Sequence, residues 1–224
     1  MSDSAEPTLA QRRSTILSEL ADLASPPPKL IAVSKRQPDA RIEEALAAGQ
    51  RVFGENLVQE AQTRWTDRQK EHADLELHLV GALQSNKADA AVALFDVIHS
   101  VDRPKLVTAL AKAIQKQGRA PTLLIQVNTG EEPQKSGVVP DGLDHLLGFA
   151  EEAAVPISGL MCIPPADEPA APHFALLAKL AKAHGLSEIS MGMSQDYALA
   201  ARLGATLVRV GTSVFGPRPD GALT

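Results

Sequence analysis

The sequence predicts an α/β protein, a (β/α)8 TIM barrel with an extra helix at the N-terminus. Eight short apolar runs rich in β-branched residues alternate with Ala-, Leu-, Glu- and Lys-rich stretches of helical period. No G-x-G-x-x-G turn follows any run, which removes the strongest signal for the competing open, doubly wound sheet. A chain of 224 residues is also near the lower end of the size range of such barrels. Eight strand–helix units therefore leave no room for a second domain.

The apolar runs are the expected strands. Most are continuous rather than alternating, as in parallel strands that are covered on both faces. They span residues 29–34, 51–55, 75–81, 96–101, 122–128, 157–163, 188–193 and 206–211. We expect one domain over 1–224, with an amphipathic helix at about 7–23 and the barrel at about 29–218.

Helical segments separate the strands, and glycine marks where several of them end. Asp39 follows Pro38 as an expected N-cap, and the helix after it runs to Gly49. Glycine just past a helix supplies the left-handed turn that sends the chain back along the sheet. The same order of helix, glycine and strand recurs at Gly118, Gly185 and Gly204.

Composition excludes several functional classes. The net charge of −5 argues against a general binder of nucleic acid or anionic membranes, which needs a basic face. Aromatic residues are only 3% of the chain, too few for a base-stacking platform. Cys162 is the only cysteine, which excludes an internal disulfide and a cysteine-based zinc site, and the six histidines lack ligand spacing. With no apolar run near 18 residues and no signal-peptide pattern, we expect a cytoplasmic protein.

Lys35 is the leading candidate for chemistry. Functional side chains of such barrels lie at the C-terminal ends of strands, and Lys35 follows the first strand there. The period of two places it on the same side as Ile31 and Val33, so it enters the mouth of the barrel if that side faces inward. Partial desolvation would lower its pKa and favour attack on an aldehyde or ketone. The alternative is a lysine that merely begins a solvated loop.

Two neighbouring loops resemble an anion site. Ser194 precedes the helix after the seventh strand, while Gly211 and Thr212 follow the eighth. Small residues allow backbone N–H groups to approach an anion, hydroxyls add donors, and barrels often hold a phosphate at this place. The alternative is ordinary capping, with Ser194 as the N-cap of the helix that contains Tyr197. Together with Lys35, the loops favour a phosphorylated carbonyl compound.

Arg209 lies within the apolar eighth strand, opposite in direction to Val208 and Val210. A buried arginine needs a partner, which could be a ring nitrogen or carboxylate of a ligand, or a structural salt bridge. Further loop residues could bind a ligand or satisfy the loop backbone: Asn56, Asn86, Lys87 and Lys135. His78 and His99 are expected to be hydrogen-bonded strand histidines.

Eight motifs in order resemble the pyridoxal phosphate homeostasis protein family. They are AVSK (32–35), FGEN (53–56), LQSNK (83–87), SVDR (100–103), VNTGEEPQKSGV (127–138), GLMCIPP (159–165), SMGMSQD (190–196) and VRVGTSVFGPR (208–218). The resemblance implies a barrel like the N-terminal domain of alanine racemase, with pyridoxal 5′-phosphate (PLP) as a Schiff base on Lys35. It also implies that Ser194, Gly211 and Thr212 hold the phosphate, that Arg209 approaches the pyridine nitrogen, and that Asn56 lines the pocket.

The sequence departs from the family pattern twice. Gln37 stands where the family often has a second lysine, which argues against a transfer of PLP through a lysine there. Ala82 replaces a histidine before LQSNK, close to the expected pocket entrance.

Three functions remain open at this stage. The resemblance implies a non-catalytic PLP carrier in vitamin B6 and amino-acid homeostasis, with other B6 vitamers as ligands and PLP-dependent apoenzymes as recipients. The sequence shows no domain-swapping extension, so we expect a monomer. The alternatives are a weak PLP-dependent amino-acid racemase or lyase and a Schiff-base aldolase of phosphorylated sugars. A racemase needs two bases on opposite faces, and this short chain has only one tyrosine, Tyr197, so we expect the carrier.

Overall fold

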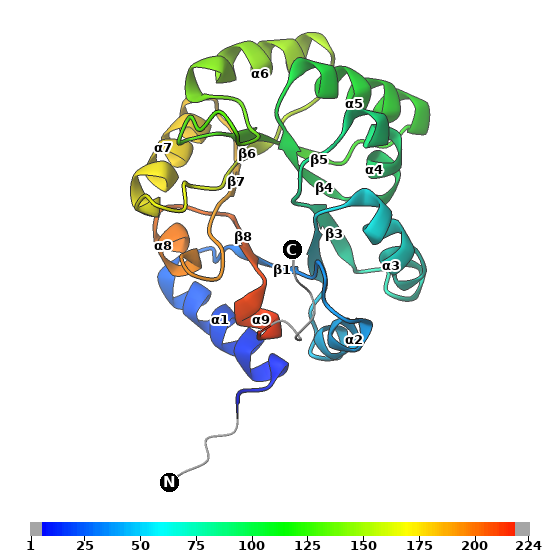
Figure 1. The fold of residues 1–224 in the computed structure, drawn as a ribbon, viewed down its shortest axis with the longest axis vertical. Helices are drawn as coiled ribbons and strands as arrows, with labels where there is room; N and C mark the ends of the chain where they lie inside the picture. The colour runs from blue at the N-terminus through cyan, green and yellow to red at the C-terminus, as the bar shows by residue number, and fades with distance from the viewer. Residues whose placement is uncertain (1–5, 218–224) are drawn as a thin grey trace.

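The computed structural model describes residues 6–217 and contains a closed, eight-stranded parallel barrel surrounded by helices (Figure 1). The predicted fold class is therefore confirmed. The strands pair in sequence order and close through β8 and β1: β1 (Lys29–Val33), β2 (Val52–Glu55), β3 (Glu76–Leu79), β4 (Val97–Val101), β5 (Thr122–Val127), β6 (Gly159–Cys162), β7 (Glu188–Ser190) and β8 (Leu207–Val210). Arg218, the end of the last motif and of the expected barrel, lies outside the described residues.

Helices follow each strand and form the outer layer. They are α2 (Asp39–Ala47), α3 (Val58–Glu71), α4 (Ala88–Leu94), α5 (Pro104–Gln117), α6 (Leu143–Glu152), α7 (Ala170–Ala183), α8 (Tyr197–Arg202) and the short α9 (Thr212–Phe215). Two 3-10 turns lie in the loops before α4 and α6, η1 (Ser85–Lys87) and η2 (Pro140–Gly142). The main apolar core fills the space between strands and helices. The outer helices thus bury the strand faces that point away from the barrel axis.

The extra N-terminal helix α1 (Leu9–Leu23) lies beside α8 and α9 (Figure 1). It starts at Leu9 because Thr8 forms a capping box with Gln11, in which each side chain accepts from the other's backbone N–H. Ile16 and Leu20, one turn apart, are buried against the barrel helices. The helix therefore closes the outer layer where the last units of the barrel meet the first.

Details of the helix ends follow the sequence in most places. The four glycines expected just past the ends of helices all adopt the left-handed backbone conformation. Their φ angles are +81° at Gly49, +63° at Gly118, +65° at Gly185 and +93° at Gly204. Asp39 is not the N-cap, because Pro38 occupies that position and Asp39 is already helical. Its carboxylate lies in the first turn, which favours negative charge, and pairs there with arginines of α3.

Inside the barrel, an apolar layer lies below a layer that carries two polar side chains, His99 and Arg209. The apolar side chains alternate with outward-facing residues along their strands: Ile31, Val52, Val97, Leu124, Met161 and Leu207. Two residues further along several of these strands, the inward positions carry Val33, Gly54, His99 and Arg209. The polar interior therefore faces the C-terminal mouth.

Candidate functional site

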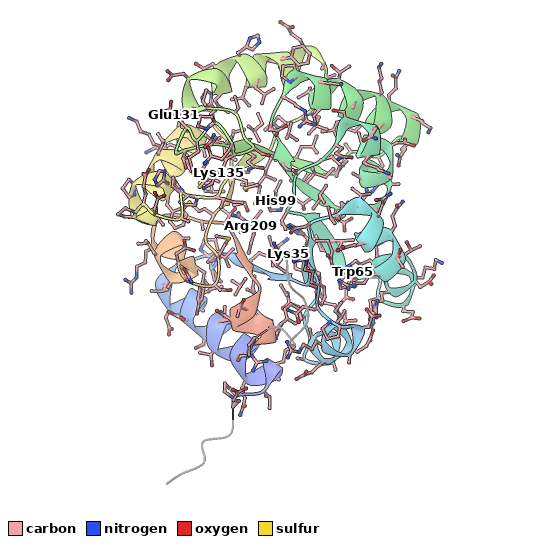
Figure 2. All side chains as sticks on the ribbon, in the orientation of Figure 1. Lys35, Trp65, His99, Glu131, Lys135 and Arg209 are labelled. Carbon is pink, nitrogen blue, oxygen red and sulfur yellow. The ribbon has the colours of Figure 1, made fainter. Side chains whose placement is uncertain are left out.

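A cavity of about 420 Å³ lies at the C-terminal mouth of the barrel. This volume lies within the range of small-molecule sites. All six residues that the sequence predicts as a binding site line this cavity: Lys35, Asn56, Ser194, Arg209, Gly211 and Thr212. Six further residues complete the lining: Val33, Val80, Ile163, Met193, Gln195 and Asp196. Figure 2 shows Lys35, Arg209 and His99 toward the centre of the barrel, and Trp65, a buried residue of α3, further from the centre. The fold thus brings together residues from positions 33 to 212.

Lys35 lies two residues beyond β1 and is half-buried in the cavity wall. Strand alternation explains the position, since Ile31 and Val33 precede it on the inner side of the barrel. The structure therefore places Lys35 as the period of two predicted, while its bond to a cofactor stays a prediction.

Glu55 is a buried carboxylate that supports the loops carrying Lys35 and Asn56. Its Oε1 accepts hydrogen bonds from Ser34 Oγ (2.8 Å), Arg64 Nη1 (3.1 Å) and Trp65 Nε1 (3.0 Å). Ser34 directly precedes Lys35, and Glu55 directly precedes Asn56. The carboxylate thus ties the ends of β1 and β2 to α3. Sequence reasoning missed this role, although a glutamate closing an apolar strand was a visible signal.

The loops after β7 and β8 are joined by hydrogen bonds between two serines. Ser194 Oγ accepts from the N–H of Ser213 at 3.3 Å, and Ser213 Oγ donates to the carbonyl oxygen of Ser194 at 3.2 Å. Ser194 does not cap α8, because Asp196 takes that position and accepts from the N–H of Met193 at 2.6 Å. The capping alternative for Ser194 is therefore wrong, and its hydroxyl faces the neighbouring loop.

Gly192 makes the turn between β7 and these loops possible. Its φ is +89°, and an added Cβ would lie 2.5 Å from Cβ of Ala200. Gly211 differs, because an added Cβ would meet nothing closer than 3.5 Å. Gly211 lines the cavity without the close contacts that surround Gly192.

Arg209 is buried and forms part of the cavity floor. Its Nη1 donates to Ser190 Oγ at 2.6 Å, and its Nη2 donates to the carbonyl oxygen of Cys162 at 2.8 Å. Burial lowers the pKa of the guanidinium, while the Cys162 and Asp196 side chains favour its charge. No ion pair of Arg209 occurs within residues 6–217, so the salt-bridge alternative fails and neutral groups hold the charge.

Other residues that the sequence proposed lie outside the cavity lining. These are Asn86, Lys87 and Lys135. Lys135 instead pairs with Glu132 and donates to the carbonyl oxygen of Pro164. Of the two departures from the family pattern, Gln37 is buried against Arg41 and Arg64, and Ala82 is exposed. Neither lines the cavity.

The six lining residues that the sequence did not single out include two exposed apolar side chains. Ile163 is 36% exposed and Met193 is 39% exposed. The others are Val33, Val80, Gln195 and Asp196. Val33 and Val80 occupy inward positions of their strands, so alternation could have identified them. Gln195 and Asp196 depend on the course of a loop, which has no such period.

His78 and His99 are hydrogen-bonded to each other inside the barrel, with 2.8 Å between Nδ1 of His78 and Nε2 of His99. The expected strand histidines are therefore confirmed. Over the described part of the chain, no cluster of three or more His, Cys, Asp or Glu side chains is suited to a metal ion. None of the described helices is both long and apolar enough to span a bilayer.

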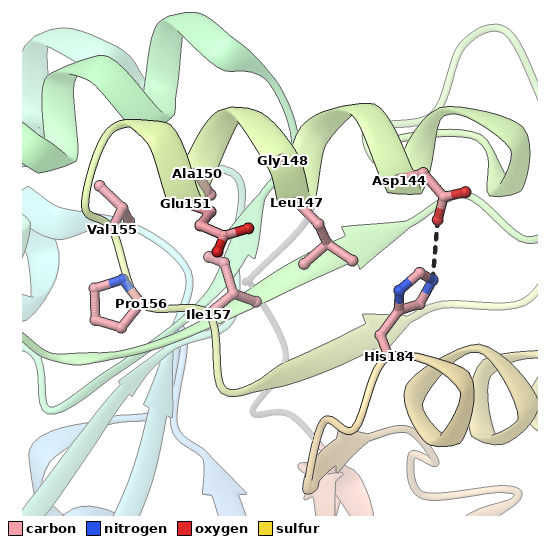
Figure 3. A pocket seen from close by; sticks show the side chains of 9 residues that line it. All are labelled: Asp144, Leu147, Gly148, Ala150, Glu151, Val155, Pro156, Ile157 and His184. Carbon is pink, nitrogen blue, oxygen red and sulfur yellow. Dashed lines mark ion pairs between the residues drawn. The ribbon is translucent and has the colours of Figure 1, made fainter.

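A second depression of about 510 Å³ lies on the outer surface, beside α6 (Figure 3). His184 Nε2 and Asp144 Oδ1 form an ion pair of 3.1 Å at its edge, and Leu147 and Ile157 contribute apolar surface. It shares no lining residue with the cavity at the C-terminal mouth and contains no lysine or arginine. We therefore assign the candidate site to the barrel mouth.

Comparison with known proteins agrees with this geometry. Residues 16–219 match the family described as alanine racemase, N-terminal domain. The pyridoxal phosphate homeostasis protein of Pseudomonas aeruginosa PAO1 is 43% identical over 203 residues, which cover 86% of each chain. This chain belongs to the pyridoxal phosphate homeostasis protein family. The family assignment made from eight motifs is thereby confirmed.

Solved structures place this member of the family among barrels of the same shape. PipY of Synechococcus elongatus PCC7942, solved with PLP bound, is 42% identical with a TM-score of 0.82, covering 93% of this chain and 100% of PipY. The alanine racemase of Clostridium difficile 630 is 11% identical with a TM-score of 0.69, and the match covers 94% of this chain but 58% of the racemase. The second likeness concerns the fold alone.

Proposed function

We propose that this chain holds PLP in the mouth of the barrel as a Schiff base on Lys35, and that it serves intracellular vitamin B6 and amino-acid homeostasis without a dedicated reaction. The observation that carries the proposal is the convergence of Lys35, Arg209 and the hydroxyl-bearing loops on one cavity. The name of the Pseudomonas relative and the PLP-bound PipY support it.

The chemistry of the lining fits PLP. Lys35 is an amine on one wall, suited to condense with an aldehyde and release water. Ser194 and Thr212 carry hydroxyls, and Gly211 leaves its backbone accessible, which suits a phosphate. Asn56 adds an amide beside Lys35. We assign the lysine to the aldehyde and the two loops to the phosphate.

Arg209 is better suited to a protein that binds PLP than to one that uses PLP for catalysis. Bound PLP supplies an electron-withdrawing ring, which is strongest when its pyridine nitrogen carries a proton. A guanidinium has only N–H donors and a fixed charge, so beside that nitrogen it would favour the unprotonated, accepting form. Arg209 would thus weaken stabilisation of a substrate carbanion.

Tyr197 supports the same conclusion. Its hydroxyl donates to Glu19 Oε2 at 2.6 Å, so it is directed to α1, and Tyr197 is absent from the cavity lining. Burial and then the Glu19 contact raise its pKa to about 12, so the hydroxyl stays protonated near neutral pH and is not available as a base. Desolvation is the main cause that raises the pKa of the buried Cys162 thiol to about 12. The thiol therefore stays protonated near neutral pH and is a poor nucleophile.

The decisive experiment is the visible spectrum of the purified protein with PLP, before and after borohydride, with mass spectrometry of the reduced peptide. We expect a reducible adduct on Lys35 that is absent in Lys35→Ala. Lys87→Ala is the matched control, because Lys87 follows another strand of the barrel, β3, but does not line the cavity. An adduct on another lysine, or a colourless protein, would refute the Schiff base on Lys35.

The loaded protein should then be assayed for racemisation and elimination across amino acids. We expect no turnover at typical enzyme rates, of order 1 s⁻¹ or faster. Turnover at such rates that depends on Lys35 would favour the racemase or lyase instead. We also expect PLP-dependent apoenzymes to accept PLP from the protein, and light scattering to show a monomer.

A further inference from the structure

A continuous hydrogen-bonded chain runs through the barrel interior below the candidate site. From the cavity floor, Arg209 Nη1 lies 2.6 Å from Ser190 Oγ, which lies 2.9 Å from His99 Nδ1. His99 Nε2 lies 2.8 Å from His78 Nδ1, and His78 Nε2 lies 2.7 Å from Glu76 Oε1. The chain thus joins β8, β7, β4 and β3, and its far end lies at the start of β3.

The two ends of the chain determine its direction. Arg209 can only donate to Ser190, and the carboxylate of Glu76, which also accepts from Lys29 at 2.8 Å, can only accept. Among the described residues, His99 Nδ1 is the acceptor available to the Ser190 hydroxyl hydrogen. Every bond is satisfied if Ser190 donates to His99, His99 donates from Nε2 to His78, and His78 donates from Nε2 to Glu76.

We propose that Ser190, His99 and His78 are positioning residues for Arg209: a one-directional hydrogen-bond chain that fixes the guanidinium beneath the site and ends on the Lys29–Glu76 pair. The inference rests on the proposed function, because the guanidinium is held for the ring end of bound PLP. It adds to that function the residues that orient the charged guanidinium at the cavity floor.

Burial favours the conformation in which every hydrogen bond of this chain is made. The side chains of His78, His99, Ser190 and Arg209 are buried, and an unmade hydrogen bond there costs the full desolvation of the group. The Ser190 hydroxyl lies within hydrogen-bond distance of both the Arg209 guanidinium and the His99 ring, so it links the two. The carbonyl of Cys162 holds the other guanidinium nitrogen. Together these contacts restrict the plane of the guanidinium.

The charged groups around His99 agree with a neutral ring at that position. The facing groups are Arg209 above and Glu76 with Lys29 below. Desolvation, and next the proximity of His78 and Arg209, lowers the pKa of His99 well below its usual value. A neutral His99 with its hydrogen on Nε2 is the tautomer that the chain requires.

Nitrogen NMR of histidine-labelled protein without PLP tests the direction of the chain. We expect both His78 and His99 to show an unprotonated Nδ1 and a protonated Nε2 at neutral pH. Assignment uses the single variants His78→Gln and His99→Gln. A protonated Nδ1 on either ring would reverse or break the chain and overturn the proposal. This result is independent of whether PLP binds.

PLP binding tests the positioning role. Ser190→Ala should weaken PLP binding at least about tenfold and shift the absorbance maximum of bound PLP, because it removes a partner of a buried charged donor. Ser190→Thr, which restores the hydroxyl, should recover the maximum. The matched control is Ser100→Ala, since Ser100 is a buried serine next to His99 whose hydroxyl has no hydrogen-bond partner.

The two proposals fail in different ways. If Lys35 forms the adduct but Ser190→Ala and Ser100→Ala bind PLP equally with the same spectrum, the positioning role is refuted and the proposed function stands. If PLP does not bind the unaltered protein, the proposed function and the positioning role both fail, although NMR still decides the direction of the chain. Circular dichroism and thermal unfolding identify variants that fail to fold. If Ser190→Ala is one of them, His99→Gln is used in its place, because it alters the next residue of the same hydrogen-bonded chain.

Discussion

The hydroxyl of Tyr197, at the first position of α8, donates a hydrogen bond of 2.6 Å to the Glu19 carboxylate of α1. The only tyrosine of the chain therefore ties the extra N-terminal helix to the barrel and is turned away from the cavity. The residue that could have served as a second base in a racemase has instead a role in packing.

Loss of this contact should affect stability and leave the site intact. Tyr197→Phe is expected to lower the free energy of unfolding by about 1 kcal/mol, the usual value of one hydrogen bond. Urea unfolding measures the change, and the PLP spectrum should not alter. A large loss of PLP retention in this variant would show instead that the hydroxyl reaches the cofactor.

The hydroxyls of the two joined loops are expected to hold the phosphate. Ser194→Ala and Thr212→Ala should each weaken PLP retention about tenfold by removing a hydrogen bond to a charged group, with circular dichroism unchanged. Equilibrium dialysis measures retention. Thr108→Ala is the matched control, because its hydroxyl bonds to a carbonyl of its own helix, α5. Unchanged affinity in both loop variants would refute the assignment of the phosphate.

The buried carboxylate of Glu55 should be needed for both the fold and the lysine loop. Glu55→Ala leaves Trp65 Nε1 without its acceptor and removes the buried carboxylate that pairs with Arg64, so it is expected to cost about 3–5 kcal/mol of stability. Glu55→Gln keeps the shape and one acceptor oxygen, so it should cost less. Denaturant unfolding of both variants is the measurement. If both variants lose equally little free energy of unfolding, the carboxylate does not support the ends of β1 and β2.

The neutral, buried His99 should make the fold sensitive to mild acid. Its pKa is lowered in the folded state, so below its usual value near 6.5 the unfolded chain binds the proton and the folded chain does not. The stabilisation is complete above that pH and is lost as the pH falls, by about 1.4 kcal/mol per pH unit for one proton. Urea unfolding between about pH 6.5 and pH 5 should show this slope, reduced in His99→Gln. Equal slopes in the two proteins would mean that His99 is protonated in the fold.

The sequence by itself determined the barrel and the residues of its mouth. Eight apolar runs determine the eight strands, and the period of two decides which side chains enter the interior. Lys35, Asn56, Arg209 and Gly211 follow from that rule, because each is an inward position at or just beyond a strand end. These features depend on local spacing, which a sequence displays directly.

The partners across the barrel were decided only by the tertiary structure. His99 meets Ser190 from a strand 91 residues away, and Tyr197 meets Glu19 across 178 residues. Alternation places a side chain inside the barrel, but its level and its opposite neighbour depend on strand tilt and register, which no local pattern encodes. For the same reason, Ser194 fits a helix cap in sequence and yet bonds to Ser213 of the next loop. A hydrogen bond needs atoms within about 3 Å, and only the closed barrel sets distances that short between remote strands.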